Sequence, residues 1–310
     1  INVVSSNANI YGNIELKAAK DITVAEADEA AGNMGILATN QKVRYADGST
    51  NEAMLQQKGN ITLTAGNSIT NNGMLIAGAA AVEGAEANVT LNAGDNITTN
   101  GAITSAGNTS LNAKGTGTEA IKVNGTVNAG GSISGTAENG PITIGAAMDS
   151  KNGGIALETN ADITINGALH SANGNVKADS KQGSIENNAS ITVEKGNVIE
   201  NAQGNIKTNA EITVNTGNVE QTAQGSIENN SGITVEKGNV IENAQGNIDN
   251  NANITVENGN INEKAGGYIN SPIDDTAPIT LESINGSINI EANGDINLYE
   301  VIANNGTADI

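Results

Sequence analysis

Short apolar segments alternate with polar ones along most of the chain, and the alternation has a period of two residues. The pattern is clearest in residues 183–266, where Ile-Thr-Val segments are separated by Gly and Asn. Alternating β-branched residues favour strands over helices, and Gly and Asn tolerate turn conformations. The pattern therefore predicts short strands of about three to five residues joined by turns.

The pattern repeats four times without a gap, in the 21-residue stretches 183–203, 204–224, 225–245 and 246–266. One repeat has too few apolar residues to form a core, but stacked repeats bury them against each other. We therefore predict an all-β fold, a parallel β-helix with an expected right hand and ~19–21 residues per coil. The predicted inward columns are Ile185, Ile191, Val193, Val198, Ile206, Ile212, Val214, Val219, Ile227, Ile233, Val235, Val240, Ile248, Ile254, Val256 and Ile261.

Polar residues also fall into columns when the repeats are aligned. Coils stacked about 4.8 Å apart allow the side-chain amides of one column to form a ladder. We expect the Glu and Lys residues of the repeats to form the solvated surface, and a stacked Glu column to line one face without converging on a cleft. The Asn ladder is Asn188, Asn209, Asn230 and Asn251; the Glu column is Glu200, Glu242 and Glu263, interrupted by Gln221.

The repeat is looser outside this region, but the same segments recur upstream and resume at 286–298. We therefore predict one elongated β-helix over residues 1–310. Three stretches break the pattern with helix-forming residues, Ala-rich runs or Pro, and we expect them to be excursions from the coil: 25–58, 77–87 and 265–278.

Composition narrows the possible functions. The chain has no Phe, Trp or Cys, so its core must be built from Ile, Val, Leu and Ala, without disulfides or thiolate metal sites. A formal net charge of −20 is unfavourable for binding nucleic acid. No apolar run approaches the ~20 residues of a membrane-spanning helix. The chain begins at Ile1, so we expect a processed product or an excised segment.

Candidate chemistry is sparse. Parallel β-helices include polysaccharide lyases and hydrolases, which need converging carboxylates. Here the adjacent pair Asp274-Asp275 falls in an expected turn, and a single Arg and a single His leave little for general acid–base catalysis. We predict a non-enzymatic protein with no catalytic residues, cofactor or metal site.

The best candidate for recognition is the expected excursion around Arg44, Tyr45 and Asp47. Loops on rigid scaffolds often bind partners, and Arg and Tyr are enriched where binding energy concentrates. A structural flap that caps the first coils is an equally good interpretation of the same residues.

The phrases NVTLNAGDNITTNGAITSAGNTSLNA (88–113) and GSINIEANGDINL (286–298) resemble the filamentous haemagglutinin family of large exoproteins. The resemblance covers about residues 59–300. The strict 21-residue repeat departs from the shorter coils usual in that family, and no N-P-N-G-I secretion motif is present.

The resemblance implies a structural shaft of a secreted bacterial adhesin or filament, acting in cell adhesion, biofilm or matrix assembly at the cell surface. Its implied partners are a receptor or glycan on a host or neighbouring cell, further copies of the chain, and an outer-membrane secretion partner. The alternatives are a β-helical carbohydrate-active enzyme and the stalk of a contact-dependent toxin.

Overall fold

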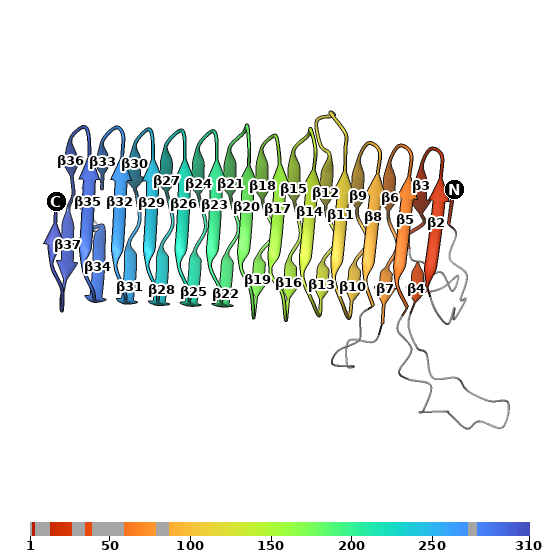
Figure 1. The fold of residues 1–310 in the computed structure, drawn as a ribbon, viewed down its shortest axis with the longest axis horizontal. Coiled ribbons are helices and arrows are strands. Elements are labelled where there is room, and N and C mark those ends of the chain that lie inside the picture. Colours follow the sequence, from red (N-terminus) through yellow and green to blue (C-terminus); the bar gives the residue numbers. More distant parts are fainter. Residues whose placement is uncertain (1, 4–12, 27–34, 39–58, 79–86, 272–277) are drawn as a thin grey trace, which may run out of the picture. The chain divides into compact units, whose positions relative to one another are not determined.

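The computed structural model describes residues 2–3, 13–26, 35–38, 59–78, 87–271 and 278–310. These residues form β-strands and no helix. The chain divides into two compact units, Ile1–Gly153 and Gly154–Ile310. In each unit successive strands run parallel and form three sheets, one strand per sheet in each turn of the chain (Figure 1). The predicted all-β, parallel β-solenoid is confirmed.

In the first unit the strands alternate in fixed order between a first, a second and a third sheet. The first sheet contains β1 (Asn2–Val3), β3 (Ile22–Val24), β6 (Ile69–Asn71), β9 (Ile97–Thr99), β12 (Ile121–Val123) and β15 (Ile142–Ile144). The second contains β4 (Ile36–Ala38), β7 (Leu75–Ala77), β10 (Ile103–Ser105), β13 (Val127–Ala129) and β16 (Met148–Ser150). The third contains β2 (Ile14–Ala18), β5 (Ile61–Ala65), β8 (Val89–Ala93), β11 (Thr109–Ala113) and β14 (Ile133–Ala137).

The second unit repeats this arrangement. Its first sheet contains β18 (Ile163–Ile165), β21 (Ile185–Asn187), β24 (Ile206–Thr208), β27 (Ile227–Asn229), β30 (Ile248–Asn250), β33 (Ile269–Asn270) and β36 (Ile296–Asn297). Its second contains β19 (Leu169–Ser171), β22 (Ile191–Lys195), β25 (Ile212–Thr216), β28 (Ile233–Lys237), β31 (Ile254–Asn258), β34 (Thr280–Asn285) and β37 (Glu300–Ala303). Its third contains β17 (Ile155–Thr159), β20 (Val176–Ser180), β23 (Val198–Ala202), β26 (Val219–Ala223), β29 (Val240–Ala244), β32 (Ile261–Ala265), β35 (Ile288–Ala292) and β38 (Ala308–Asp309).

The coil length differs between the units. In the repeats, equivalent Asn residues that bond across one coil are 21 residues apart, whereas pairs in the first unit are 28, 24 and 20 apart. Two strands lie within stretches expected to leave the coil: β4 inside 25–58 and β33 inside 265–278. Both pair in register with their neighbours. Parts of all three stretches lie outside the described residues.

The core is built by strand alternation. In β5 the residues Ile61, Leu63 and Ala65 are buried and the two Thr between them are half-exposed. All sixteen Ile and Val residues of the inward columns in the repeats are also buried. Because successive side chains of a strand point to opposite faces, each coil contributes one inward set to a continuous stack.

One glycine column allows the coils to turn between the second and third sheets. Gly238 has φ +146°, a conformation that other residues rarely adopt. A Cβ at this position would overlap the carbonyl oxygen of Gly217 in the preceding coil. Close backbone approach therefore requires Gly here, and the same holds for Gly217 and Gly259.

Candidate functional site

The candidate recognition residues Arg44, Tyr45 and Asp47 lie outside the described residues.

The Asn ladder lies on the outside of the second unit. Asn209 donates from its Nδ2 to Oδ1 of Asn188 at 2.7 Å, and Asn230 to Asn209 and Asn251 to Asn230 at 2.8 Å each. Every step joins one coil to the next through side-chain amides. Because these amides are engaged with each other, the ladder serves cohesion between coils.

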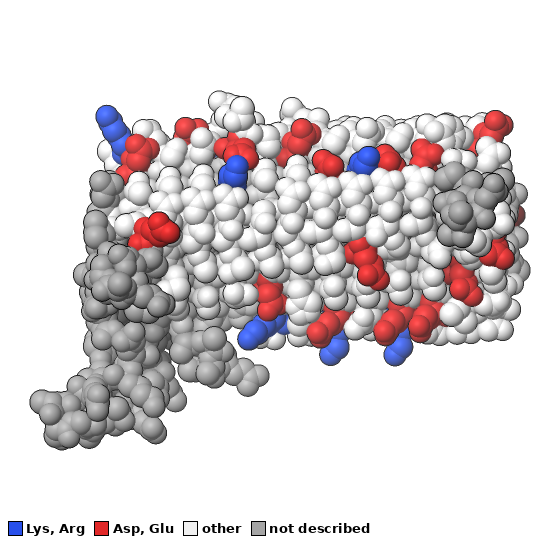
Figure 2. All heavy atoms as spheres, turned by 180° about the vertical axis from the view of Figure 1, so that it is seen from behind, with Lys and Arg blue, Asp and Glu red and all other residues white. Residues whose placement is uncertain are grey.

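The outer charges are arranged in register as well. Glu186, Lys207, Glu228 and Asp249 occupy the same position in four consecutive strands of the first sheet. The Lys207 Nζ lies 3.3 Å from Oε1 of Glu228, with both side chains well exposed. Exposed pairs of this kind contribute about 0–1 kcal/mol. On the face shown in Figure 2 the acidic side chains are scattered along the edges and form no single patch.

The Glu column is not on the surface, so the prediction that it lines a solvated face is wrong. Glu200, Gln221, Glu242 and Glu263 are between 0% and 2% exposed. Each is the central residue of a third-sheet strand whose first and last residues, such as Val240 and Ala244, are also buried. The alternation pattern places the acid on the same side as these apolar neighbours. The alternation is visible in the sequence and predicts an inward position, whereas the prediction of an exposed column followed from the acidic residue type alone.

A second polar column accompanies the buried acids. Asn187, Thr208, Asn229 and Asn250 end successive strands of the first sheet and are 0% exposed. Sequence analysis did not single them out. Thr208, Asn229 and Asn250 each form a hydrogen bond with the residue 13 positions further on in the Glu column. Asn187 lies 13 residues before Glu200, but its Nδ2 has no partner. The two columns therefore meet inside the coils.

Hydrogen bonds connect these columns within and between coils. Gln221 Nε2 donates to Glu200 Oε2 at 2.7 Å and to Thr208 Oγ1 at 3.0 Å. Asn229 Nδ2 donates to Glu242 Oε1 at 3.0 Å and to Asn250 Oδ1 at 2.9 Å. One coil further on, Asn250 Nδ2 donates to Glu263 Oε1 at 2.9 Å in the same way. We call this set the inner polar column: Glu200, Thr208, Gln221, Asn229, Glu242, Asn250 and Glu263.

Burial dominates the electrostatics of the inner polar column. It raises the pKa of Glu200 and of Glu263 to about 7, partly opposed by amide hydrogen bonds from Gln221 and Asn250. The pKa of Glu242 is raised well above its ordinary value, first by burial and then by the negative charge of Glu263. Moving a carboxyl out of water disfavours its charged form, so these groups retain protons at unusually high pH.

The first unit has an open groove on the outer side of its third sheet, with a volume of about 360 Å³. Stacked uncharged side chains line it, and Asn112 Nδ2 donates to Asn92 Oδ1 at 2.9 Å. At one end Lys114 Nζ lies 3.2 Å from Oε1 of Glu138. Such a surface offers hydrogen bonds to an uncharged polar ligand, with one carboxylate in its lining. The principal lining residues are Thr64, Asn92, Asn112, Lys114, Thr136 and Glu138.

A smaller groove in the second unit lies over β32 and β35 and is lined by Glu263 and Glu291. Lys264 Nζ lies 2.8 Å from Glu291 Oε2, and this hydrogen bond lowers the pKa of the Glu291 carboxyl. Strand alternation turns Glu263 inward and leaves Lys264 exposed, so the two carboxyls lie on opposite faces of the sheet. They do not form a pair that shares one substrate.

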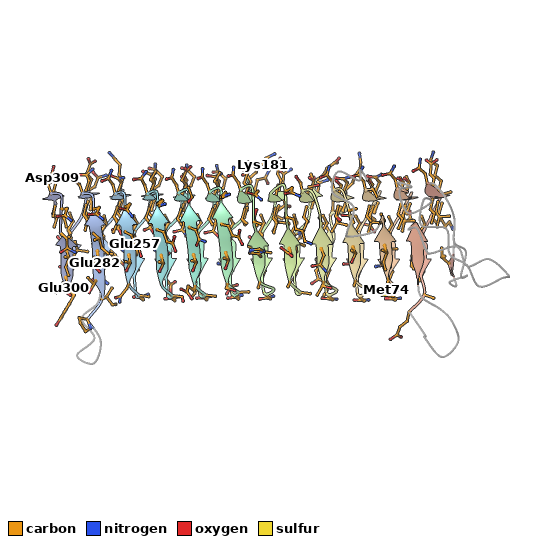
Figure 3. All side chains as sticks on the ribbon, turned by 90° about the horizontal axis from the view of Figure 1, so that it is seen from below. Met74, Lys181, Glu257, Glu282, Glu300 and Asp309 are labelled. Atoms are coloured by element: carbon orange, nitrogen blue, oxygen red, sulfur yellow. The ribbon has the colours of Figure 1, made fainter. Side chains whose placement is uncertain are left out.

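Carboxylates at the end of the second unit are also separate. Glu257, Glu282 and Glu300 come from the successive strands β31, β34 and β37 and are spaced along the sheet (Figure 3). Glu282 accepts a hydrogen bond from Asn304 Nδ2 at 3.1 Å, and Glu300 accepts one from Thr280 Oγ1 at 2.9 Å. Within the described ranges, no group of three or more His, Cys, Asp or Glu residues is placed to hold a metal ion. The same ranges contain no helix that is long and apolar enough to cross a membrane.

Comparison of the chain with protein-family models, curated protein sequences and solved structures found no match. The class of protein is therefore given by its own architecture: a β-solenoid in which repeated coils are joined by polar ladders outside and, in the repeats, inside.

Proposed function

We propose that this chain is the non-enzymatic structural shaft of a secreted bacterial surface adhesin or filament, similar to the filamentous haemagglutinin family. In this role the stacked coils hold a binding element away from the cell, or associate with further copies in a matrix. The receptor or glycan contacts other parts of the protein or the Arg44-Tyr45-Asp47 segment, and an outer-membrane partner exports the chain.

The observation that supports this proposal is the repetition of one surface from coil to coil. In the repeats several outer positions hold the same residue at every step, as in the Asn ladder and the Thr192, Thr213, Thr234 and Thr255 column. Repetition of the same residues lengthens the solenoid without bringing different functional groups together at one point. Catalytic sites instead bring different functional groups to a single point.

The grooves of the described residues support a non-enzymatic role in the same way. Glycoside hydrolysis canonically uses two carboxyls about 5–9.5 Å apart on either side of the bond that breaks. The groove of the first unit offers Glu138, already paired with Lys114. The alternative of a carbohydrate-active enzyme therefore has less support than the shaft.

Deletion of one complete repeat tests the proposal. Removing residues 225–245 joins Gln224 to Gly246 and brings Lys207 beside Asp249, with every inward column intact. We expect the shortened protein to fold, to reach the cell surface and to retain adhesion. Removing only 225–234 shifts the register of all later strands, so this control should misfold.

Three results would count against the adhesin shaft. Turnover of a polysaccharide by the purified chain, lost on deletion of 225–245, would favour the enzyme. Failure of antibodies against residues 183–266 to label intact producing cells, with labelling after lysis, would contradict a surface location. A toxic C-terminal domain in the complete protein would favour the toxin stalk.

A further inference from the structure

We propose that the inner polar column is a proton-dependent core in which Glu242 and Glu263 are neutral carboxylic acids, and that loss of their protons loosens the surrounding coils. This inference concerns the conformation of the second unit and does not rest on the proposed adhesion role.

The position of the two acids is fixed by strand register. Gln221 pairs with Glu242, and Glu242 pairs with Glu263, in consecutive strands of the third sheet. Neighbouring strands of a sheet are about 4.8 Å apart. All three side chains point inward and are 0–2% exposed. Two carboxylates in adjacent coils would therefore stand side by side, away from water.

The hydrogen bonds reveal a shortage of donors. From Glu200 to Glu263 the inner polar column has five buried atoms without a partner, and all five are oxygens: Glu200 Oε1, Gln221 Oε1, Asn229 Oδ1, Glu242 Oε2 and Glu263 Oε2. The side-chain nitrogens of Gln221, Asn229 and Asn250 already donate. Buried acceptors without donors are costly. One buried nitrogen, Asn187 Nδ2, also has no partner, but it belongs to the coil of Glu200. Around Glu242 and Glu263 the missing donors must therefore come from hydrogen atoms on the carboxyl groups.

Protonation of the two acids supplies these donors. A carboxyl proton on Glu242 gives a donor to its neighbour Gln221, whose Oε1 is unpartnered. A carboxyl proton on Glu263 gives a donor toward the carboxyl of Glu242, its neighbour in the sheet. Gln221 already provides the equivalent contact one step earlier, since its amide donates to Glu200. In the inner polar column a neutral carboxylic acid and a side-chain amide thus both donate a hydrogen bond to the residue of the preceding coil.

No cation stands opposite these acids among the described residues. The inward side chains of the neighbouring first-sheet strands β27 and β30 are Ile and Asn, and those of the second-sheet strands β28 and β31 are Ile and Val. The buried titratable groups of the described chain are Glu200, Glu242 and Glu263. Protonation is therefore the available way to remove the charge, and the raised pKa of each of the three acids agrees with it.

The direct test measures the protons in the complete folded chain. With 13C-labelled glutamate, the side-chain carboxyl resonances are followed by NMR from pH 4 to pH 9. We expect the carboxyl resonances of Glu200, Glu242 and Glu263 to titrate well above the ordinary range of a Glu, with the Glu242 resonance absent from E242Q and the Glu263 resonance absent from E263Q. E236Q makes the same charge change on an exposed residue of β28 and should leave them in place. Titration of every carboxyl below pH 5 would overturn the proposal, and this outcome needs no variant to fold.

A second measurement tests the consequence for stability. Urea unfolding of the wild type should show the folded-to-unfolded ratio falling by up to tenfold per pH unit for each buried acid that keeps its proton in the folded chain and ionises in the unfolded chain. The double variant E242Q/E263Q should flatten this dependence between pH 5 and 8, while E236Q should not. An unchanged pH dependence in the double variant would contradict the proposed role of these protons.

Discussion

The two units place different chemistry at the same position of the coil. The central inward residue of the third-sheet strands is Leu63, Leu91 and Leu111 in β5, β8 and β11 of the first unit, and Glu or Gln from β23 to β32 of the second. Both sets are 0–2% exposed, in five-residue strands with parallel pairing on both sides. The coil geometry therefore decides that this position is buried, whatever residue occupies it.

The comparison shows which interactions a Leu and a Glu each need when they are buried at this position. A buried Leu side chain contributes about 1.5–3 kcal/mol and needs only close packing. A buried Glu needs amide partners and a proton, because an isolated charge in the core is very costly. Asn229 and Asn250 supply the amides in the second unit. Conversely, the Leu column of the first unit has no need of such partners.

The largest expected effect comes from placing an acid in the Leu column. Leu91→Glu puts a carboxyl between Leu63 and Leu111, where the buried amide of the same coil, Asn71, already donates to Gly101 O. We expect a loss of about 4 kcal/mol or more in the free energy of unfolding at pH 8, and a smaller loss at pH 5, where the acid is neutral. Urea unfolding at both pH values measures this. Thr90→Glu, on the outer side of the same strand, is the control and should change little; equal effects would contradict the inward register.

The wild-type protein should show a pH response confined to one unit. The folded-state pKa of about 7 for Glu200 and Glu263 lies above the ordinary value of 4.5. Their contribution to stability is therefore complete below about pH 4.5 and is lost as pH rises through about 7, by roughly 3 kcal/mol per carboxyl. Hydrogen exchange, corrected for its intrinsic pH dependence, should show faster opening of β26, β29 and β32 at pH 8. An equal increase in the hydrogen-exchange rate of β5, β8 and β11 would contradict a pH response confined to the second unit.

A smaller effect follows from removing an internal amide. Asn229→Ala deletes the donor to both Glu242 and Asn250 and should cost about 1–3 kcal/mol. Asn71 is the matched residue of the first unit, buried at the end of β6, where its Nδ2 donates to Gly101 O at 3.3 Å. Asn71→Ala should cost less, because no carboxyl depends on it. Thermal unfolding of both variants gives the comparison, and a larger loss in the first unit would contradict it.

The smallest expected effect concerns the outer ladder. Asn230→Ala removes one rung, which bonds to Asn209 and accepts from Asn251. Water replaces the lost partners on the outside, so the cost should be about 0.5–1.5 kcal/mol and independent of pH between 5 and 8. Urea unfolding at both ends of this range measures it. A pH-dependent loss would show that the outer and inner columns are coupled.

Much of this architecture was accessible from the sequence because the repeat aligns residues by strict spacing. Ile191-Thr192-Val193 already gives the strand and its inner face, and the 21-residue step gives the stacking of Asn209 on Asn188. The interior acids were missed for a physical reason. The general preference of Glu for water predicts exposure, whereas Val240 and Ala244 on either side of Glu242 fix its direction through alternation.

The sequence by itself determined the strands, the turns that need glycine and the coil length, because these follow from local alternation and exact repetition. Only the tertiary structure decided that the column of Glu242 faces the column of Asn229, since their 13-residue separation matters only once the coil closes. It also decided the charge of the acids. Whether a carboxyl keeps its proton depends on the water and the hydrogen-bond partners around it. Closure of the coil excludes water from these carboxyls and fixes which side chains lie next to them.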